Sequence, residues 1–158
     1  MGLYDYYEAD PPIECPKCGG QLEGWVGSDG HPFLFVWRQG VASPIDHRVD
    51  MDFRVPPESL AELRLPTEFA IHGGECECGY RFHGVRCDEQ FELRCGAADG
   101  VWTTCEINPA PTPANDVGDG WIQCSECCDV WSRDADRRLY LCPGCGNLTR
   151  LSDGRPLG

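Results

Sequence analysis

The sequence predicts a small, β-rich fold that metal ions hold together at two groups of cysteines. The 158 residues include 12 Cys, 19 Gly and 13 Pro, and 41% of them are hydrophobic. No long stretch repeats apolar residues with the 3.6-residue period of an amphipathic helix. Short runs of β-branched and aromatic residues instead alternate with turn residues. We therefore expect short strands, turns and cross-links rather than helices.

The clearest strand of the N-terminal half covers residues 33–37, "FLFVW", with glycine and proline before it and glycine after it. The preceding segment, residues 21–30, places Leu22, Gly24 and Val26 on one face and ends in the turn sequence "SDG". Two strand candidates joined by such a turn are typical of a β-hairpin. The sequence therefore predicts that these two segments pair with each other.

One short helix is predicted over residues 55–66. Pro57 suits its first turn, and Leu60 and Leu63 are three residues apart on one face. Further short strands are expected over residues 80–87, 90–95 and 101–107, with turns at Asp88 and in "GAADG".

A proline-rich segment at residues 108–118 divides the chain. Three prolines and few apolar side chains are typical of a stiff, solvated linker. We expect an acidic, β-rich domain over residues 1–107 and a second domain over residues 119–158. A unit of about 40 residues usually needs a disulfide or a metal ion to fold, so the second domain should contain one.

Two Cys-x-x-Cys motifs in the second domain meet this need. Cys124 and Cys127 form the first motif, Cys142 and Cys145 form the second, and residues 128–141 separate them. This spacing lets four thiolates surround one tetrahedral zinc ion. The sequence therefore predicts a zinc site with these four ligands.

The residues around these motifs suit short strands. Residues 129–132, "DVWS", and 138–141, "RLYL", can pair across the polar turn between them, and residues 146–151, "GNLTRL", can return as a third strand. With the two motifs, this pattern resembles a three-stranded zinc ribbon over residues 119–151. Zinc ribbons serve transcription, translation, RNA handling and scaffolding, so the resemblance implies a fold and a metal but no single activity.

A second, less regular zinc site is predicted from Cys15, Cys18, Cys76 and Cys78. The first pair, "CPKCGG", resembles the knuckle of rubredoxins and zinc ribbons, and the chain is loosely similar to small bacterial or phage zinc-ribbon proteins. The second pair, "CECG", has one residue between its cysteines instead of two, and residues 19–75 form a long insertion between the pairs. Such an insertion is tolerable because the cost of loop closure grows only logarithmically with length. We expect a split four-cysteine site that completes a zinc-stapled β protein with two structural zinc ions.

Four cysteines remain: Cys87, Cys95, Cys105 and Cys128. Their spacings do not match a zinc knuckle, so core thiols and a third metal site are both open interpretations. Cys128 has the position where the other knuckles carry glycine, which predicts that it is dispensable for zinc. The first residues lack the regions of a signal peptide, and no segment suits a membrane span. We therefore expect a cytoplasmic protein, in which thiols are more often ligands than disulfides.

Both zinc ions are expected to be structural, with no catalytic residues and no other cofactor-binding residues. Four thiolates fill the coordination shell and leave no open position for a substrate. A carboxylate beside a histidine can serve acid–base chemistry. Residues 37–53 contain such a pair, but this segment equally suits a solvated loop or a partner-binding face. Its polar residues are Arg38, Asp46, His47, Arg48, Asp50 and Asp52. The other histidines are dispersed, at His31, His72 and His83.

The charge of the chain indicates its class of partner. With 26 acidic and 13 basic side chains, the formal net charge is −13. Residues 1–107 carry −11, from 19 acidic and 8 basic side chains, and residues 119–158 carry only −1. Such a surface repels the phosphates of nucleic acids and complements a protein with a basic surface. The sequence therefore predicts a protein–protein interaction or adaptor module.

Two other functions stay open. A nucleic-acid-associated accessory protein for transcription or RNA could use the nearly neutral ribbon. Arg133, Arg137 and Arg138 would then face phosphates while Trp131 and Tyr140 stack on bases. The net charge alone also suits an acidic inhibitor or immunity-type protein that blocks a basic nuclease or regulator.

The first residues, "LYDYYEADPP", hold three tyrosines among acidic residues. If this segment is disordered, it is a candidate docking peptide. If it is ordered, its tyrosines cover the N-terminal domain. The sequence favours neither interpretation, and it leaves the oligomeric state open.

Overall fold

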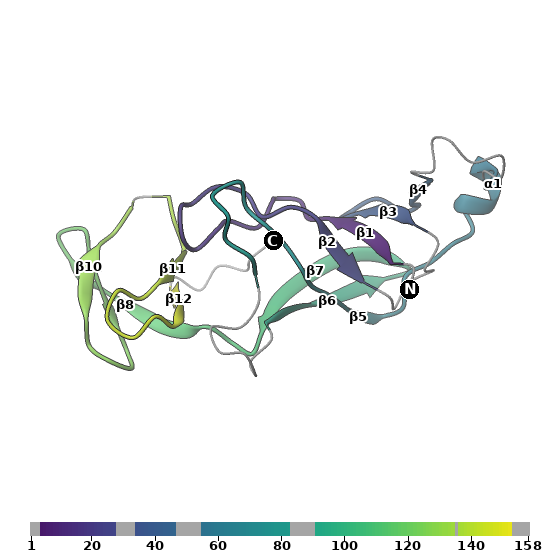
Figure 1. The fold of residues 1–158 in the computed structure, drawn as a ribbon. Coiled ribbons are helices and arrows are strands. Elements are labelled where there is room, and N and C mark those ends of the chain that lie inside the picture. Colours follow the sequence, from purple (N-terminus) through teal and green to yellow (C-terminus); the bar gives the residue numbers. More distant parts are fainter. Residues whose placement is uncertain (1–3, 28–33, 47–54, 83–90, 135, 153–158) are drawn as a thin grey trace.

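The computed structural model describes residues 4–27, 34–46, 55–82, 91–134 and 136–152. Within these ranges, twelve strands form three sheets and one helix makes a single turn, which confirms the β-rich class. Figure 1 shows an elongated molecule with β10 near one end and α1 at the other. The elements are β1 (Asp5–Glu8), β2 (Trp25–Gly27), β3 (Phe35–Arg38), β4 (Ile45–Asp46), α1 (Pro57–Leu60), β5 (Glu68–Ile71), β6 (Glu92–Ala98), β7 (Val101–Asn108), β8 (Thr112–Gly118), β9 (Trp121–Cys124), β10 (Val130–Ser132), β11 (Leu139–Leu141) and β12 (Leu148–Leu151).

Two sheets pack against each other around an aromatic core. The four-stranded sheet has the order β2-β1-β3-β4, and the three-stranded sheet has the order β5-β6-β7. Tyr7 of β1 stacks on Phe69 of β5, with ring centroids 5.5 Å apart, and meets Trp102 of β7 edge-on at 6.0 Å. Trp25 and Trp37 are fully buried in the same cluster. Burial of such large rings is a major favourable contribution to the folding of a small domain.

A buried carboxylate holds β1 beside β3. Asp5 is fully buried, and its Oδ1 accepts a hydrogen bond from the backbone N–H of Phe35 at 3.1 Å. Its Oδ2 accepts a second bond from the indole N–H of Trp37 at 2.9 Å. A buried charge is tolerated only when it is well hydrogen-bonded, so Asp5 strongly favours one register of the parallel pair. In that register Tyr6 lies opposite Val36.

The predicted hairpin of residues 21–30 with residues 33–37 is wrong. Strands β2 and β3 do not pair, because β1 lies between them, antiparallel to β2 and parallel to β3. The expected turn at residues 28–30 lies outside the described residues.

The tyrosine-rich start is ordered over residues 4–8, with Tyr7 in the core and Tyr6 41% exposed on the surface. Of its two interpretations, the structure supports the ordered one.

The predicted helix forms, but only as one turn with Pro57 at its start. Leu60 and Leu63 are half-buried and pack against the core, as their spacing suggests. Strands β6 and β7 confirm the predicted strands at residues 90–95 and 101–107. The strand expected over residues 80–87 is absent from its described part, residues 80–82. None of the described helices is long and apolar enough to cross a membrane.

The C-terminal sheet has five strands, in the order β10-β9-β8-β12-β11. The predicted linker is wrong over residues 112–118, because they form β8 at the centre of this sheet. β8 pairs antiparallel with β9 and parallel with β12. The pairing predicted for residues 129–132 and 138–141 is also wrong, since β10 and β11 lie at opposite edges. β8 buries only Ala114, so backbone hydrogen bonds on both sides form this strand without a hydrophobic sequence pattern.

The main core continues into the C-terminal sheet. Leu139 of β11 and Leu148 of β12 are fully or almost fully buried in the same cluster as Trp25 and Trp102. A smaller cluster of Ile122, Tyr140 and Leu151 packs with Trp131 elsewhere in this sheet. The two halves of the chain therefore share part of one core.

Replacing Asp5 with alanine should destabilise the protein by about 1–3 kcal/mol, because two buried N–H groups lose their acceptor. Chemical denaturation followed by tryptophan fluorescence measures this loss. Asp136 is exposed and provides a matched control, so Asp136→Ala should change the free energy of unfolding by no more than about 0.5 kcal/mol. Equal effects of the two substitutions would contradict the role given to the buried carboxylate.

Candidate metal centres

Four sulfurs from two distant segments converge in the N-terminal half. The Sγ atoms of Cys15, Cys18, Cys76 and Cys78 all lie within 4.8 Å of one another. Cys15 Sγ is 3.7 Å from Cys78 Sγ, and Cys18 Sγ is 3.5 Å from Cys76 Sγ. The two loops that carry them lie side by side near the middle of the molecule (Figure 1). The fold thus brings together the two pairs that the long insertion separates in the sequence.

A second group has the same composition in the C-terminal sheet. The Sγ atoms of Cys124, Cys127, Cys142 and Cys145 also lie within 4.8 Å of one another. Cys124 Sγ is 3.9 Å from Cys145 Sγ, and Cys127 Sγ is 3.4 Å from Cys142 Sγ. β9 ends at the first of these cysteines, while β11 leads into the second motif and β12 follows it. The eight cysteines therefore form the two groups that their spacing predicts.

The same kind of backbone turn presents each pair of sulfurs. In the three Cys-x-x-Cys motifs, the residue four positions after the first cysteine donates its N–H to that cysteine's carbonyl. In the shorter Cys-x-Cys motif the bond closes one residue earlier, so this motif makes a similar turn with one residue fewer. These bonds run from Gly19 to Cys15 (2.8 Å), from Cys128 to Cys124 (3.0 Å), from Gly146 to Cys142 (2.8 Å) and from Gly79 to Cys76 (2.9 Å).

These turns end in left-handed backbone, which favours glycine. Gly19, Gly79 and Gly146 have φ angles of 77°, 87° and 75°, and Cys128 has the corresponding position with a φ of 63°. A residue with a side chain is less stable than glycine in this conformation, by about 1–2 kcal/mol. Cys128 is exposed and does not belong to the sulfur group, which supports the prediction that it is an extra thiol.

The sulfur distances fit a tetrahedral thiolate site. Four sulfurs at ~2.3 Å from one central ion lie about 3.8 Å from each other, by the geometry of a tetrahedron. The closest pairs here lie 3.4 to 3.9 Å apart. Backbone N–H groups also approach the sulfurs, as at Gly20, whose nitrogen is 3.3 Å from Cys18 Sγ. Hydrogen bonds of this kind stabilise thiolates, so each group can hold one metal ion.

The thiols of the N-terminal group differ in proton affinity. Burial raises the pKa of the Cys15 thiol to about 12. The backbone N–H of Tyr80 lowers the pKa of the Cys78 thiol to about 7. Metals bind the thiolate form, so an incoming ion must displace the proton from Cys15. Metal affinity at this centre should therefore rise with pH.

The remaining described cysteines do not form a third metal group. Cys95 and Cys105 lie opposite each other on β6 and β7, and both are buried in the main core. The Sγ of Cys95 is 3.7 Å from the carbonyl oxygen of Leu93. The core-thiol interpretation therefore holds for these two residues, while Cys87 lies outside the described residues.

Two members of the polar group weighed as an active site have partners within the fold. The Nε of Arg38 lies 2.6 Å from a carboxylate oxygen of Glu8. The Oδ2 of Asp46 accepts a hydrogen bond from the backbone N–H of Val55 at 2.9 Å. The expectation that this segment has no catalytic role stays a prediction without a test. The residues His31, His47, Arg48, Asp50, Asp52 and His83 lie outside the described ranges.

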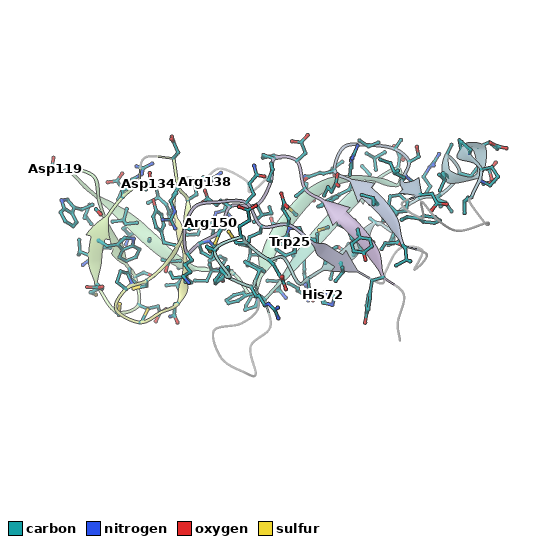
Figure 2. All side chains as sticks on the ribbon, turned by 45° about the horizontal axis from the view of Figure 1, so that its top comes forward. Trp25, His72, Asp119, Asp134, Arg138 and Arg150 are labelled. Carbon is teal, nitrogen blue, oxygen red and sulfur yellow. The ribbon has the colours of Figure 1, made fainter. Side chains whose placement is uncertain are left out.

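Contacts between the two centres have no signal in the sequence. The Glu14 carboxylate, next to the first knuckle, accepts hydrogen bonds from the backbone N–H groups of Arg138 and Leu139. The Nη2 of Arg137 donates to the carbonyl oxygen of Pro16 at 2.6 Å. Figure 2 shows Arg138 where the C-terminal sheet meets the N-terminal half. These partners are 121 to 125 residues apart, so local patterns cannot reveal them.

Comparisons with protein-family models, with curated proteins and with solved structures return no match to this chain. The case for metal binding consists of three observations on the chain itself. These are the number and type of donor atoms, the knuckle turns that present them, and the distances between the sulfurs. All three agree for both centres.

A pair of neighbouring substitutions tests the assignment of the ligands. Cys127→Ser should lower the metal content from two ions to one per chain, because it removes a ligand of the C-terminal centre. Cys128→Ser should keep both ions, since that thiol does not belong to the sulfur group. Native mass spectrometry counts the ions in each variant. An equal loss of metal in the two variants would show that the register of this knuckle is wrong.

Alkylation tests the assignment of the core thiols. Burial raises the pKa of the Cys105 thiol to about 11 and raises that of Cys95 further. Both therefore stay protonated at pH 8, and only the thiolate reacts readily. Iodoacetamide should label exposed Cys128 at least about tenfold faster than these two in the metal-loaded protein. Peptide mapping measures the rates, and equally fast labelling of Cys95 or Cys105 would contradict their place in the core.

Proposed function

We propose that this protein is a non-enzymatic zinc-binding protein that acts as a protein–protein interaction or adaptor module. The observation that carries this proposal is the closed donor set of each centre, four cysteine sulfurs within 4.8 Å of one another. Four thiolates complete a tetrahedral shell and leave no position for a substrate or a reactive water. A metal bound in this way contributes free energy of folding rather than chemistry.

Zinc is the metal proposed for both centres. Tetrahedral sets of four thiolates suit zinc or iron. Zinc has no redox chemistry and no electronic preference for geometry, which suits a purely structural role. Elemental analysis of the purified chain separates the two metals, and two zinc ions per chain are expected.

The acidic N-terminal half provides the proposed docking face for a protein with a basic surface. A groove of about 730 Å³ lies beside β1, β2 and β3. Tyr6 and Ile45 line it and are 41% and 44% exposed. The carboxylates of Glu8 and Glu23 flank these apolar groups. Arg38, the only cation among the lining residues, pairs with Glu8, so Glu23 gives the lining its net negative charge. An aromatic and an aliphatic anchor beside acidic groups complement a basic surface.

Partner capture from the source cells tests this function. The zinc-loaded chain should retain a protein partner at low ionic strength and release it as salt screens the charges. Glu23→Lys should reduce recovery of that same partner by at least about tenfold, because it reverses a charge in the groove. Glu106→Lys makes the same change on an exposed position of β7 and should leave recovery unchanged.

Two results would contradict the proposal. One is equal recovery of the partner by Glu23→Lys and the unmodified chain. The other is turnover of a metabolite by the purified protein without any partner.

A further inference from the structure

A second cavity lies where the first cysteine knuckle meets the C-terminal sheet. It has a volume of about 620 Å³. Pro16 and Lys17 of the knuckle form one wall, and residues 131–134 with Arg137 and Tyr140 form most of the rest. Asp134 also lines it and is labelled next to Arg138 in Figure 2. The size is within the range of pockets that hold small-molecule ligands.

The charge of this cavity is opposite to that of the chain. Lys17, Arg133 and Arg137 line it, against a single carboxylate from Asp134. Arg133 Nη1 pairs with Asp116 at 3.0 Å. Arg137 packs against the first knuckle. Its Cδ is so close to Gly19 that a Cβ built on this glycine would lie only 2.9 Å away. With Asp134 in the lining and Asp116 on Arg133, the three cations keep a net positive charge of one in a protein whose net charge is −13, which favours an anionic ligand.

Several donors in the walls of this cavity have no acceptor. The Nε atoms of Arg133 and Arg137 and the Nε1 of Trp131 are buried without a hydrogen-bond partner among the described residues. Buried polar groups are nearly always paired, so each such group needs an explanation. All three side chains line the same cavity. Because these nitrogens are buried in the walls, acceptor oxygens of a ligand would reach them only if the side chains turn toward the cavity.

Aromatic rings lie beside the cations. Trp131 is half-buried and meets the Tyr140 ring edge-on, with centroids 6.0 Å apart. The guanidinium carbon of Arg137 is 4.9 Å from the centroid of the Tyr140 ring. Planar bases stack on aromatic side chains, and guanidinium groups bind phosphate oxygens. The cavity therefore combines the two types of group that recognise a phosphorylated base.

We propose that this cavity binds a nucleotide, whose phosphate Lys17, Arg133 and Arg137 hold and whose base lies against Trp131. A free nucleotide and the phosphorylated end of a single strand share this chemistry. The net charge of the chain favours the free nucleotide, since a long polyanion meets repulsion over the rest of the surface. This site is separate from the proposed docking groove, and it does not depend on the identity of the protein partner.

The sequence offers a specific probe for this site, because Lys17 is the only lysine in the chain. An amine-reactive reagent therefore labels Lys17 and the α-amino group at the start of the chain, which acts as an internal control. In the full metal-loaded chain, adenosine 5′-monophosphate should slow labelling of Lys17 and leave the α-amino group unchanged. Calorimetry with the same nucleotide, with adenosine and with inorganic phosphate measures the contribution of each part. Adenosine and phosphate should each bind at least about tenfold more weakly than the nucleotide.

Variants locate the site without disturbing the metal centres. Lys17→Gln and Arg133→Gln should each weaken nucleotide binding by about tenfold, because each removes one charge-assisted contact. Arg94→Gln removes an exposed cation on β6 and should leave binding unchanged. All three variants should keep two metal ions, which separates loss of this site from loss of the fold.

The outcomes separate the two sources of ligand and the failure of the proposal. Stronger protection of Lys17 by a 5′-phosphorylated single-stranded hexamer than by the mononucleotide would identify the strand end as the ligand. The reverse order would identify the free nucleotide. Absence of Lys17 protection by both probes would overturn the proposal, and so would equal affinity for inorganic phosphate and the nucleotide.

Discussion

Two sets of four cysteine sulfurs, each gathered within 4.8 Å, are the constraint on which the rest of this structure depends. Four thiolates at such distances repel one another strongly in the low dielectric of a protein. Protonation or a central cation relieves this repulsion, and only the cation also attracts all four groups at once. An ion bound in this way would cross-link segments that are separated by residues 19–75 in one centre and by residues 128–141 in the other. Such links would supply the closure that a chain with short strands and little helix needs.

The two centres and the main core depend on each other. β11 leads into the second Cys-x-x-Cys motif of the C-terminal centre and β12 follows it, and Leu139 and Leu148 on these strands fill the core shared with the N-terminal sheets. On the other side, Glu14 binds the start of β11 and precedes the first cysteine of the N-terminal centre. The result is one body that presents an acidic groove beside β1 and a cationic cavity at the junction of its halves.

The elements that sequence patterns predicted correctly are those with local causes. A knuckle needs two cysteines and a residue with positive φ close together in the chain, and three of the four knuckles carry glycine there. Strands β6 and β7 alternate buried and exposed side chains for much of their length, so periodicity reveals them. The helix turn follows from one proline in its first turn. By contrast, β8 has proline, asparagine and aspartate and buries only Ala114, so nothing in its composition predicts a strand.

By itself the sequence determined the composition of the two metal centres, the β-rich class and the charge of the surface, because each follows from residue type and short spacing. Only the tertiary structure decided the order of the strands, since pairing depends on which backbone edges meet in space. It inserted β1 between β2 and β3, and the buried carboxylate of Asp5 joins β1 to β3. It also placed Lys17 beside Arg133 and Arg137, which lie in the other half of the chain. The sequence alone indicated Arg133 and Arg137 with Trp131 and Tyr140, because these residues are close together in the chain. Only the folded molecule adds Lys17 to them, since it lies in the other half of the chain.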